Sequence, residues 1–216
     1  MEKRKVLVVE DDALLRSLIS DVLNSAGFAV TAAGNAVDAK NAISNFDPDV
    51  ALLDIELGVG PSGIDLAEFI KSQAPHVAII FLTHLPDPRF AGVDSRAIPK
   101  KSAYIRKEMI SQPGLLLEIV ESVLRDEMGR GMRHDLDPQR PFAALSQSQV
   151  AVLRSVALGL SNSEIATQRN TTVRAVENLI RRTLSAAGIE NEATVNIRTA
   201  AVRAYIEAAG LPVSNE

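Results

Sequence analysis

Residues 6–12, VLVVEDD, decide the fold of the first half of this 216-residue chain. Four consecutive apolar residues, three of them β-branched, are typical of a strand that is covered on both faces. The acidic residues Asp11 and Asp12 follow at once, and leucine, isoleucine and valine then recur at helical spacing until Gly27. The stretch therefore predicts a buried strand that leads directly into a helix.

The same alternation of strand and helix continues to residue 127. Further strands are predicted at 28–32, 49–53, 77–82 and 103–106, and further helices at 35–46, 62–73 and 114–127. Such an order favours an α/β fold, a doubly wound, five-stranded parallel sheet with right-handed crossovers. Ligands of these sheets bind at the carboxyl ends of the strands.

Polar residues that can carry chemistry follow the predicted strands. They are Asp11, Asp12, Asp54, Thr83 and Lys107. Neighbouring carboxylates repel one another unless a cation joins them, and an all-oxygen set of ligands suits Mg²⁺. With a metal bound, Asp54 is a candidate in-line nucleophile towards a phosphoryl group, and Thr83 and Lys107 are candidates for binding the phosphoryl oxygens.

Each of these residues also has a simpler interpretation. Asp12 alone is equally well explained as the N-cap of the following helix. Thr83 and Lys107, taken singly, are a turn hydroxyl and a solvated lysine. The joint pattern, with every residue at a strand end, favours the phosphoryl-transfer interpretation.

Four segments of this half resemble the landmarks of the receiver domain of bacterial two-component response regulators, over residues 1–127. The segments are VLVVEDD (6–12), LLDIELG (52–58), FLT (81–83) and AYIRK (103–107). The resemblance implies a phosphoacceptor at Asp54, a switch hydroxyl at Thr83, a switch aromatic at Tyr104 and a phosphate-binding lysine at Lys107. It further implies that Asp11, Asp12 and Asp54 hold Mg²⁺ together with the backbone carbonyl of Glu56.

The chain departs from the receiver pattern after the fourth strand. His84 stands where a small residue is usual, and residues 85–102 contain three prolines where the family has its fourth helix. Because proline inside a helix costs about 3 kcal/mol, we expect a shortened helix or a mobile loop there, with an altered dimer face beside it. Lys100 and Lys101 also follow a possible strand, but Pro99 would interrupt it.

The second half is predicted to be helical. Residues 128–144 lack periodicity and are interpreted as a linker, in which His134 is expected to be solvated. Short helices are then predicted at 146–158, 163–168 and from 172, with a last helix at 193–209. Two short helices joined by a tight turn match a helix-turn-helix, while the helical pattern alone equally fits a small bundle with a charged surface.

The charge distribution separates the two halves. Residues 1–127 hold 13 basic and 19 acidic residues, whereas residues 168–182 hold four arginines and one glutamate. A local basic stripe suits a phosphate backbone, although many such runs are only solvated faces.

Residues 145–166, LSQSQVAVLRSVALGLSNSEIA, resemble the output domain of LuxR-type (NarL/FixJ) regulators, and the register continues over roughly 145–209. The resemblance implies an all-α helix-turn-helix DNA-binding domain at 145–216. Glu177, Asn178 and Arg181 would then face the major groove, and Thr172, Arg174 and Arg182 would lie nearer the DNA backbone.

Together these features predict a DNA-binding response regulator. A sensor histidine kinase would phosphorylate Asp54 with the help of Mg²⁺, and phosphorylation would draw Thr83 and Tyr104 inward. The change would either release the output domain or pair two receivers, and so control homodimer formation and promoter binding. Beyond accepting and losing this phosphoryl group, the protein is not expected to be an enzyme. One alternative is a phosphorylation-independent scaffold for dimerisation or ligand sensing. Another is a small-molecule phosphatase or haloacid-type hydrolase, but the sequence shows no evident domain that would cover a substrate.

Composition excludes several classes of protein and indicates the cellular compartment. The chain has no cysteine, which excludes a disulfide scaffold, thiolate metal sites and cysteine catalysis. No apolar run approaches the roughly 20 residues that span a bilayer, and acids follow the first apolar stretch too soon for a signal peptide. A cytoplasmic protein without membrane contact is expected.

Overall fold

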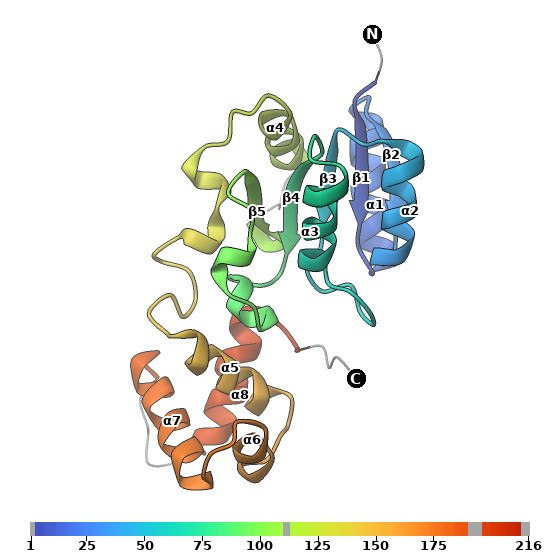
Figure 1. Cartoon of the computed structure of the whole chain (residues 1–216). Coiled ribbons are helices and arrows are strands. Elements are labelled where there is room, and N and C mark those ends of the chain that lie inside the picture. Colours follow the sequence, from blue (N-terminus) through green and yellow to red (C-terminus); the bar gives the residue numbers. More distant parts are fainter. Residues whose placement is uncertain (1–2, 110–112, 190–195, 213–216) are drawn as a thin grey trace. The chain divides into compact units, whose positions relative to one another are not determined.

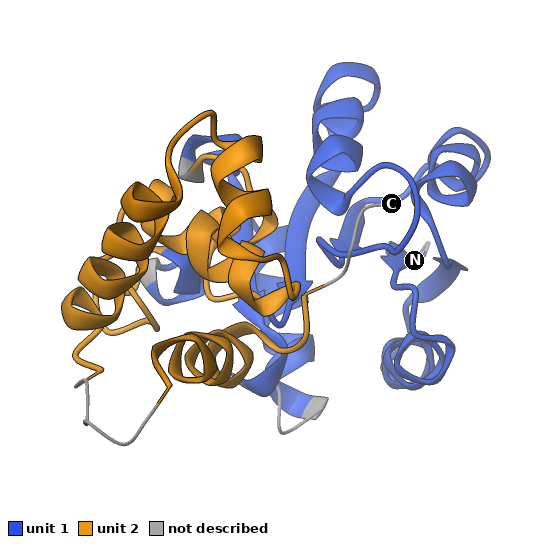
Figure 2. Ribbon diagram, turned by 90° about the horizontal axis from the view of Figure 1, so that it is seen from below, with its two compact units in different colours: residues 1–84, 96–135, 215–216 blue, residues 85–95, 136–214 orange. Residues whose placement is uncertain are grey.

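The computed structural model describes residues 3–109, 113–189 and 196–212. It divides into two compact units (Figure 2). The sheet unit comprises the residues up to His84 and then Arg96–Asp135, and the helical unit comprises Leu85–Ser95 and Leu136–Ser214. The chain therefore passes from the sheet unit into the helical unit and back before it enters the helical unit a second time.

The sheet unit is built on five parallel strands (Figure 1). They are β1 (Lys5–Val9), β2 (Ala29–Ala33), β3 (Val50–Leu53), β4 (Ala78–Thr83) and β5 (Ser102–Arg106). Their order in the sheet is β2-β1-β3-β4-β5, so β1 and β3 are neighbours. The doubly wound α/β fold predicted from the sequence is confirmed.

Four α-helices cover this sheet: α1 (Ala13–Ser25), α2 (Ala36–Phe46), α3 (Gly63–Gln73) and α4 (Pro113–Leu124). Ile19 and Leu23 of α1 share one apolar core with the inward side chains of α4. Leu14 and Leu18, which have the same helical spacing, are 80% and 59% exposed. A helix on the face of a sheet buries only one stripe, so the apolar pattern of α1 is wider than the face it buries.

The segment after α4 is ordered against the edge of the sheet. Arg133 forms an isolated parallel bridge with Tyr104 of β5, and the backbone N–H of Arg106 donates to Nδ1 of His134 at 3.1 Å. Asp135 is buried and accepts two hydrogen bonds from Arg133, at 2.8 and 2.7 Å. The side chain of His134 thus accepts a backbone hydrogen bond from β5, whereas the sequence predicts that it is solvated.

Residues 85–101 contain no α-helix. Two short 3₁₀ helices, η1 (Pro88–Ala91) and η2 (Ser95–Ala97), occupy this stretch. Asp87 caps η1 by accepting from the N–H of Arg89, and Gly92 ends it at a φ of 83°. The prolines exclude a regular helix, as predicted, but Phe90 is fully buried, so this part of the segment is packed.

The helical unit contains α5 (Gln147–Ala157), α6 (Asn162–Gln168), α7 (Val173–Ala186) and α8 (Ile197–Ala209). Ser146 and Ser161 begin α5 and α6 with capping boxes, and Thr172 caps α7. The helical spacing of Val173, Val176, Ile180 and Leu184 predicts an inner stripe on α7. Val176, Ile180 and Leu184 are buried, together with Thr183, whereas Val173 is 42% exposed. Val195, predicted in the last helix, lies outside the described residues.

Among the described residues, no helix combines the length and the apolar character that crossing a bilayer requires.

Candidate functional site

Three carboxylates meet at the carboxyl edge of the sheet. Val9 of β1 pairs with Leu53 of β3, so the residues that follow these two strands are brought together. Oxygens of Glu10, Asp11 and Asp54 all lie within 4.8 Å of one another. Glu10 and Asp54 are only 2% and 6% exposed, so two of the three carboxylates are held where water is scarce.

Lys107, directly after β5, joins this cluster from the other side. Its Nζ lies 2.7 Å from Oδ2 of Asp54 and 2.7 Å from Oε2 of Glu10. Burial alone would lower the pKa of Lys107, but Asp54 and Glu10 outweigh that effect and raise it. Burial and the charge of Asp54 raise the pKa of Glu10, against the opposing pull of Lys107. One ammonium therefore does not fully compensate the carboxylates, and the donor set fits a further, divalent cation.

Asp12 lies outside this cluster. Its exposed carboxylate accepts hydrogen bonds from the N–H groups of Leu14 and Leu15, at 2.8 and 3.1 Å, and so caps α1. These bonds, Leu15 first and then Leu14, lower the pKa of Asp12. The structure thus places Glu10, not Asp12, beside Asp11 and Asp54. The pairing of β1 with β3 explains the difference. It brings Glu10, directly after β1, next to Asp54, directly after β3, whereas Asp12 caps α1.

The two predicted switch residues are already inside the protein. Thr83, the last residue of β4, and Tyr104 of β5 are both fully buried. The ring of Tyr104 lies 6.2 Å from that of Phe81. From the sequence, phosphorylation is expected to draw these side chains inward. In this structure both are already buried, so they do not start from exposed positions.

His84 and Glu56 follow the carboxyl ends of β4 and β3. Nδ1 of His84 lies 3.0 Å from Oε1 of Glu108, and both side chains are about half exposed. The N–H of Glu56 donates to Oδ1 of Asp54 at 3.3 Å. Asp54 is therefore held through both oxygens, by Glu56 at Oδ1 and by Lys107 at Oδ2.

The start of α3 packs tightly beneath Asp54. The N–H of Gly63 donates to the carbonyl of Ile55 at 3.0 Å. A Cβ atom added to Gly63 would collide with the carbonyl oxygen of Asp54. Only glycine permits this close approach of helix and strand end.

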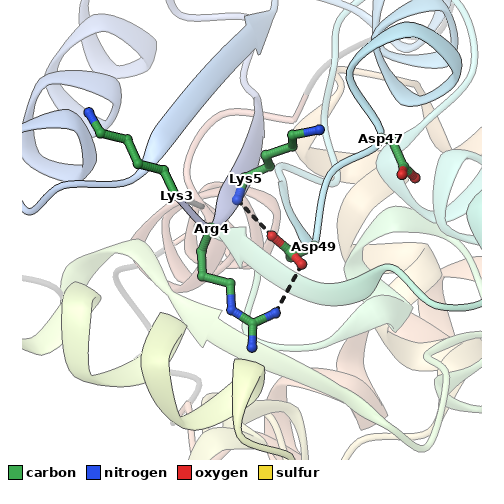
Figure 3. Close-up of a pocket in the computed structure, with 5 residues that line it drawn as sticks. All are labelled: Lys3, Arg4, Lys5, Asp47 and Asp49. Atoms are coloured by element: carbon green, nitrogen blue, oxygen red, sulfur yellow. Dashed lines mark hydrogen bonds and ion pairs between the residues drawn. The ribbon is translucent and has the colours of Figure 1, made fainter. Parts of the chain in front are cut away.

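A second group of charged residues lies at the opposite, amino end of the strands (Figure 3). It lines a pocket of about 340 Å³ formed by Lys3, Arg4, Lys5, Asp47 and Asp49. Asp49 accepts hydrogen bonds from the N–H of Lys5 at 2.7 Å and from Arg4 at 3.0 Å. These bonds hold β1 beside the start of β3, so the observed contacts of this group are structural.

In the helical unit, α7 presents a polar outer face. The six residues predicted to contact DNA all lie on this helix or at its N-cap, and all are exposed: Thr172, Arg174, Glu177, Asn178, Arg181 and Arg182. Arg181 donates to Oδ1 of Asn178 at 3.1 Å, and Thr172 accepts from the N–H of Ala175 at 3.2 Å. Three arginines on one exposed helix can bind phosphate oxygens or base edges.

Comparison with known proteins identifies the first unit. The family model described as the response regulator receiver domain matches residues 6–95. The N-terminal domain of a response regulator/sensory box/GGDEF three-domain protein from Carboxydothermus hydrogenoformans is 32% identical, with a TM-score of 0.50, over 56% of this chain and 94% of that one.

Other relatives extend over both units. Oxygen regulatory protein NreC of Staphylococcus aureus is 25% identical over 188 residues, which cover 80% of this chain and 86% of NreC. A structure of two RcsB dimers bound to two parallel DNAs matches 96% of this chain and 99% of RcsB, with a TM-score of 0.58 and 19% identity, and so shows a shared fold. With its acidic cluster and its buried lysine at the carboxyl edge of the sheet, the chain belongs to the response regulators, and its sheet unit is a receiver domain.

Proposed function

We propose that the protein is a DNA-binding regulator of a two-component system that is switched by phosphorylation of Asp54. One observation carries this proposal: a buried lysine, Lys107, contacts a nearly buried carboxylate, Asp54, at the edge of the sheet where ligands bind. RcsB, whose fold the chain shares, has been solved on DNA, which supports a DNA-binding role for α7.

The proposed step is transfer of a phosphoryl group from a phosphohistidine of a sensor kinase. A carboxylate oxygen of Asp54 forms the new O–P bond, the P–N bond to the imidazole breaks, and the imidazole nitrogen keeps the electron pair. Lys107, held by Glu10 and Asp54, is placed to bind an oxygen of the transferred group. Beyond this acceptance and the later hydrolysis of the acyl phosphate, we propose no enzymatic activity.

We further propose a Mg²⁺ site at the same cluster. Glu10, Asp11 and Asp54, with the backbone carbonyl of Glu56, are the candidate ligands. A bound divalent cation would supply positive charge that offsets the carboxylates and the incoming phosphoryl oxygens.

Glu10 and Asp12 are expected to respond differently to loss of their charge. Glu10→Gln should raise the Mg²⁺ concentration needed for half-maximal phosphorylation by acetyl phosphate about tenfold or more, because it removes a carboxylate from the cluster. Asp12→Asn is the matched control: asparagine also caps helices, so the requirement should stay close to that of the unmodified chain. Equal effects of the two changes would contradict this placement of the metal.

On the DNA side, we propose that a homodimer places two copies of α7 in successive major grooves. The phosphorylated sheet unit would favour this dimer and so raise promoter affinity. Since its target is genomic DNA, we place the protein in the cytoplasm.

Arg181→Ala is expected to weaken binding to a genomic fragment about tenfold and to reduce the dependence of the affinity on salt. Arg203→Ala is the control, because Arg203 is an exposed arginine of α8 that is paired with Glu207. Fluorescence anisotropy at several salt concentrations measures both effects. Equal losses in the two variants would count against α7 as the DNA-reading helix. If phosphorylation does not change the DNA affinity of the unmodified chain, the alternative of a phosphorylation-independent scaffold is favoured.

A further inference from the structure

A short segment of the first half of the chain is part of the helical unit. We name residues 85–95, which follow β4 and contain η1, the strap. Figure 2 shows it in the colour of the helical unit, although residues 96–135, which follow it, return to the sheet unit. In place of a fourth receiver helix, the chain therefore inserts a segment into the core of the output domain.

The strap is anchored by an aromatic cluster. Phe90 is fully buried, and its ring centroid lies 5.5 Å from that of Tyr205 on α8 and 6.1 Å from that of Phe142. The hydroxyl of Tyr205, itself 1% exposed, donates to the carbonyl of Phe90 at 3.5 Å. Aromatic contacts of this kind contribute beyond the area they bury, so the strap is an integral part of the helical unit.

Buried charges hold the strap in register. Asp87 is fully buried and accepts hydrogen bonds from Nε of Arg89 and from Nε of Arg140, both at 2.8 Å. Arg89 also donates to the carbonyls of Phe142, at 3.1 Å, and of Leu145. Burial would raise the pKa of Asp87, but the bonds from Arg89 and Arg140 outweigh it and lower the pKa. A buried network of this kind is demanding in geometry, so it favours one position of the strap over shifted ones.

The strap begins one residue beyond His84, and Thr83 is the last residue of β4. Thr83 and Tyr104 are already buried, so rotation of an exposed side chain inward is not the available motion. A shift of Thr83 towards a new phosphoryl group would pull the backbone at Leu85 and thereby the anchors at Asp87 and Phe90. Packed cores respond to such small shifts by changing between discrete arrangements.

We propose that the strap transmits the phosphorylation state of Asp54 to the DNA-reading helices through the core of the output domain. The inference rests on the proposed function, which supplies the switch and the DNA. It replaces release of a free output domain, since extracting the strap would remove Phe90 from its contacts with Tyr205 and Phe142. It would also leave Arg140 without Asp87, and the carbonyls of Phe142 and Leu145 without Arg89.

The first test asks whether the strap belongs to the helical unit in solution. Phe90→Ala in the full chain should speed amide hydrogen exchange of α5 and α8 about 100-fold, and more than that of β1 and β3. Phe81→Ala, at a fully buried phenylalanine of β4, is the matched control and should reverse the order. If Phe90→Ala speeds α5 and α8 no more than β1 and β3, the strap is not part of that core.

The second test measures coupling. The readout is the ratio of DNA affinities with and without prior treatment with acetyl phosphate and Mg²⁺. We expect a ratio on the order of tenfold for the unmodified chain and a ratio close to one for Asp87→Asn, while Asp54 is still labelled in the variant. The control is Asp137→Asn, the same change at an exposed aspartate of the helical unit, which should keep the ratio.

The outcomes separate the two proposals. If the Asp87→Asn variant is folded and labelled and keeps the full ratio, the proposed role of the strap is wrong and the proposed function is unaffected. An unmodified chain that is not labelled at Asp54, or whose ratio is already one, would overturn the proposed switch itself and with it the role of the strap.

Discussion

Replacement of Asp54 by asparagine is expected to abolish phosphorylation of the full chain by acetyl phosphate and Mg²⁺. An amide oxygen is a poor nucleophile, whereas the carboxylate of Asp54 is nearly buried and positioned by Lys107 at 2.7 Å and by the N–H of Glu56 at 3.3 Å. Intact-mass spectrometry should show one added phosphoryl group on the unmodified chain and none on the variant.

A matched aspartate serves as the control. Asp47 is an exposed acid of the same unit with a φ of 51°, a conformation that asparagine adopts readily. Asp47→Asn should therefore fold and be labelled like the unmodified chain. Labelling of the Asp54→Asn variant to the same extent would place the phosphoacceptor elsewhere and remove the basis of the proposed switch.

Gly63→Ala is expected to damage both the stability and the switch. The added methyl group would collide with the carbonyl oxygen of Asp54, so α3 must move away from the end of β3. Overpacking of this kind costs about 3 kcal/mol, and the displaced Asp54 should also accept phosphoryl groups more slowly. Urea denaturation and the rate of labelling by acetyl phosphate measure the two effects.

Gly114→Ala distinguishes the steric cause from a general effect of the substitution. Gly114 lies in α4, and a Cβ added there meets nothing within 4 Å. Alanine should therefore raise the free energy of unfolding by about 0.5 to 1 kcal/mol, through the lower conformational entropy of the unfolded chain. A loss of stability at both positions would argue against the contact with Asp54.

The sheet was predictable because its signals are local. Runs such as VLVV at 6–9, with acids directly behind them, mark a strand and its carboxyl end without reference to the rest of the chain. The same holds for the helical unit, where Ser146 and Thr172 begin α5 and α7 as expected, and Ser161 caps α6 two residues before the predicted start. The resemblance to response regulators identified Asp54 and Lys107, which the fold then brings together.

The contacts that were missed depend on strand register or on distant segments. Glu10 enters the cluster through the pairing of β1 with β3, a register that the local sequence does not contain. His134 accepts from the backbone of β5, 28 residues earlier, and Arg140 reaches Asp87 across 53 residues. Prolines correctly excluded a helix after β4, but no local pattern shows that Phe90 lies against Tyr205.

The distance along the chain between Phe90 and Tyr205, 115 residues, has a consequence during synthesis. At about 5 to 20 residues per second, roughly 6 to 23 s pass between the synthesis of Phe90 and that of Tyr205, its partner on α8. Throughout that interval a large apolar ring has left the ribosome and has no finished core to enter. We therefore expect the nascent chain to need protection from aggregation around Phe90 until α8 has been made.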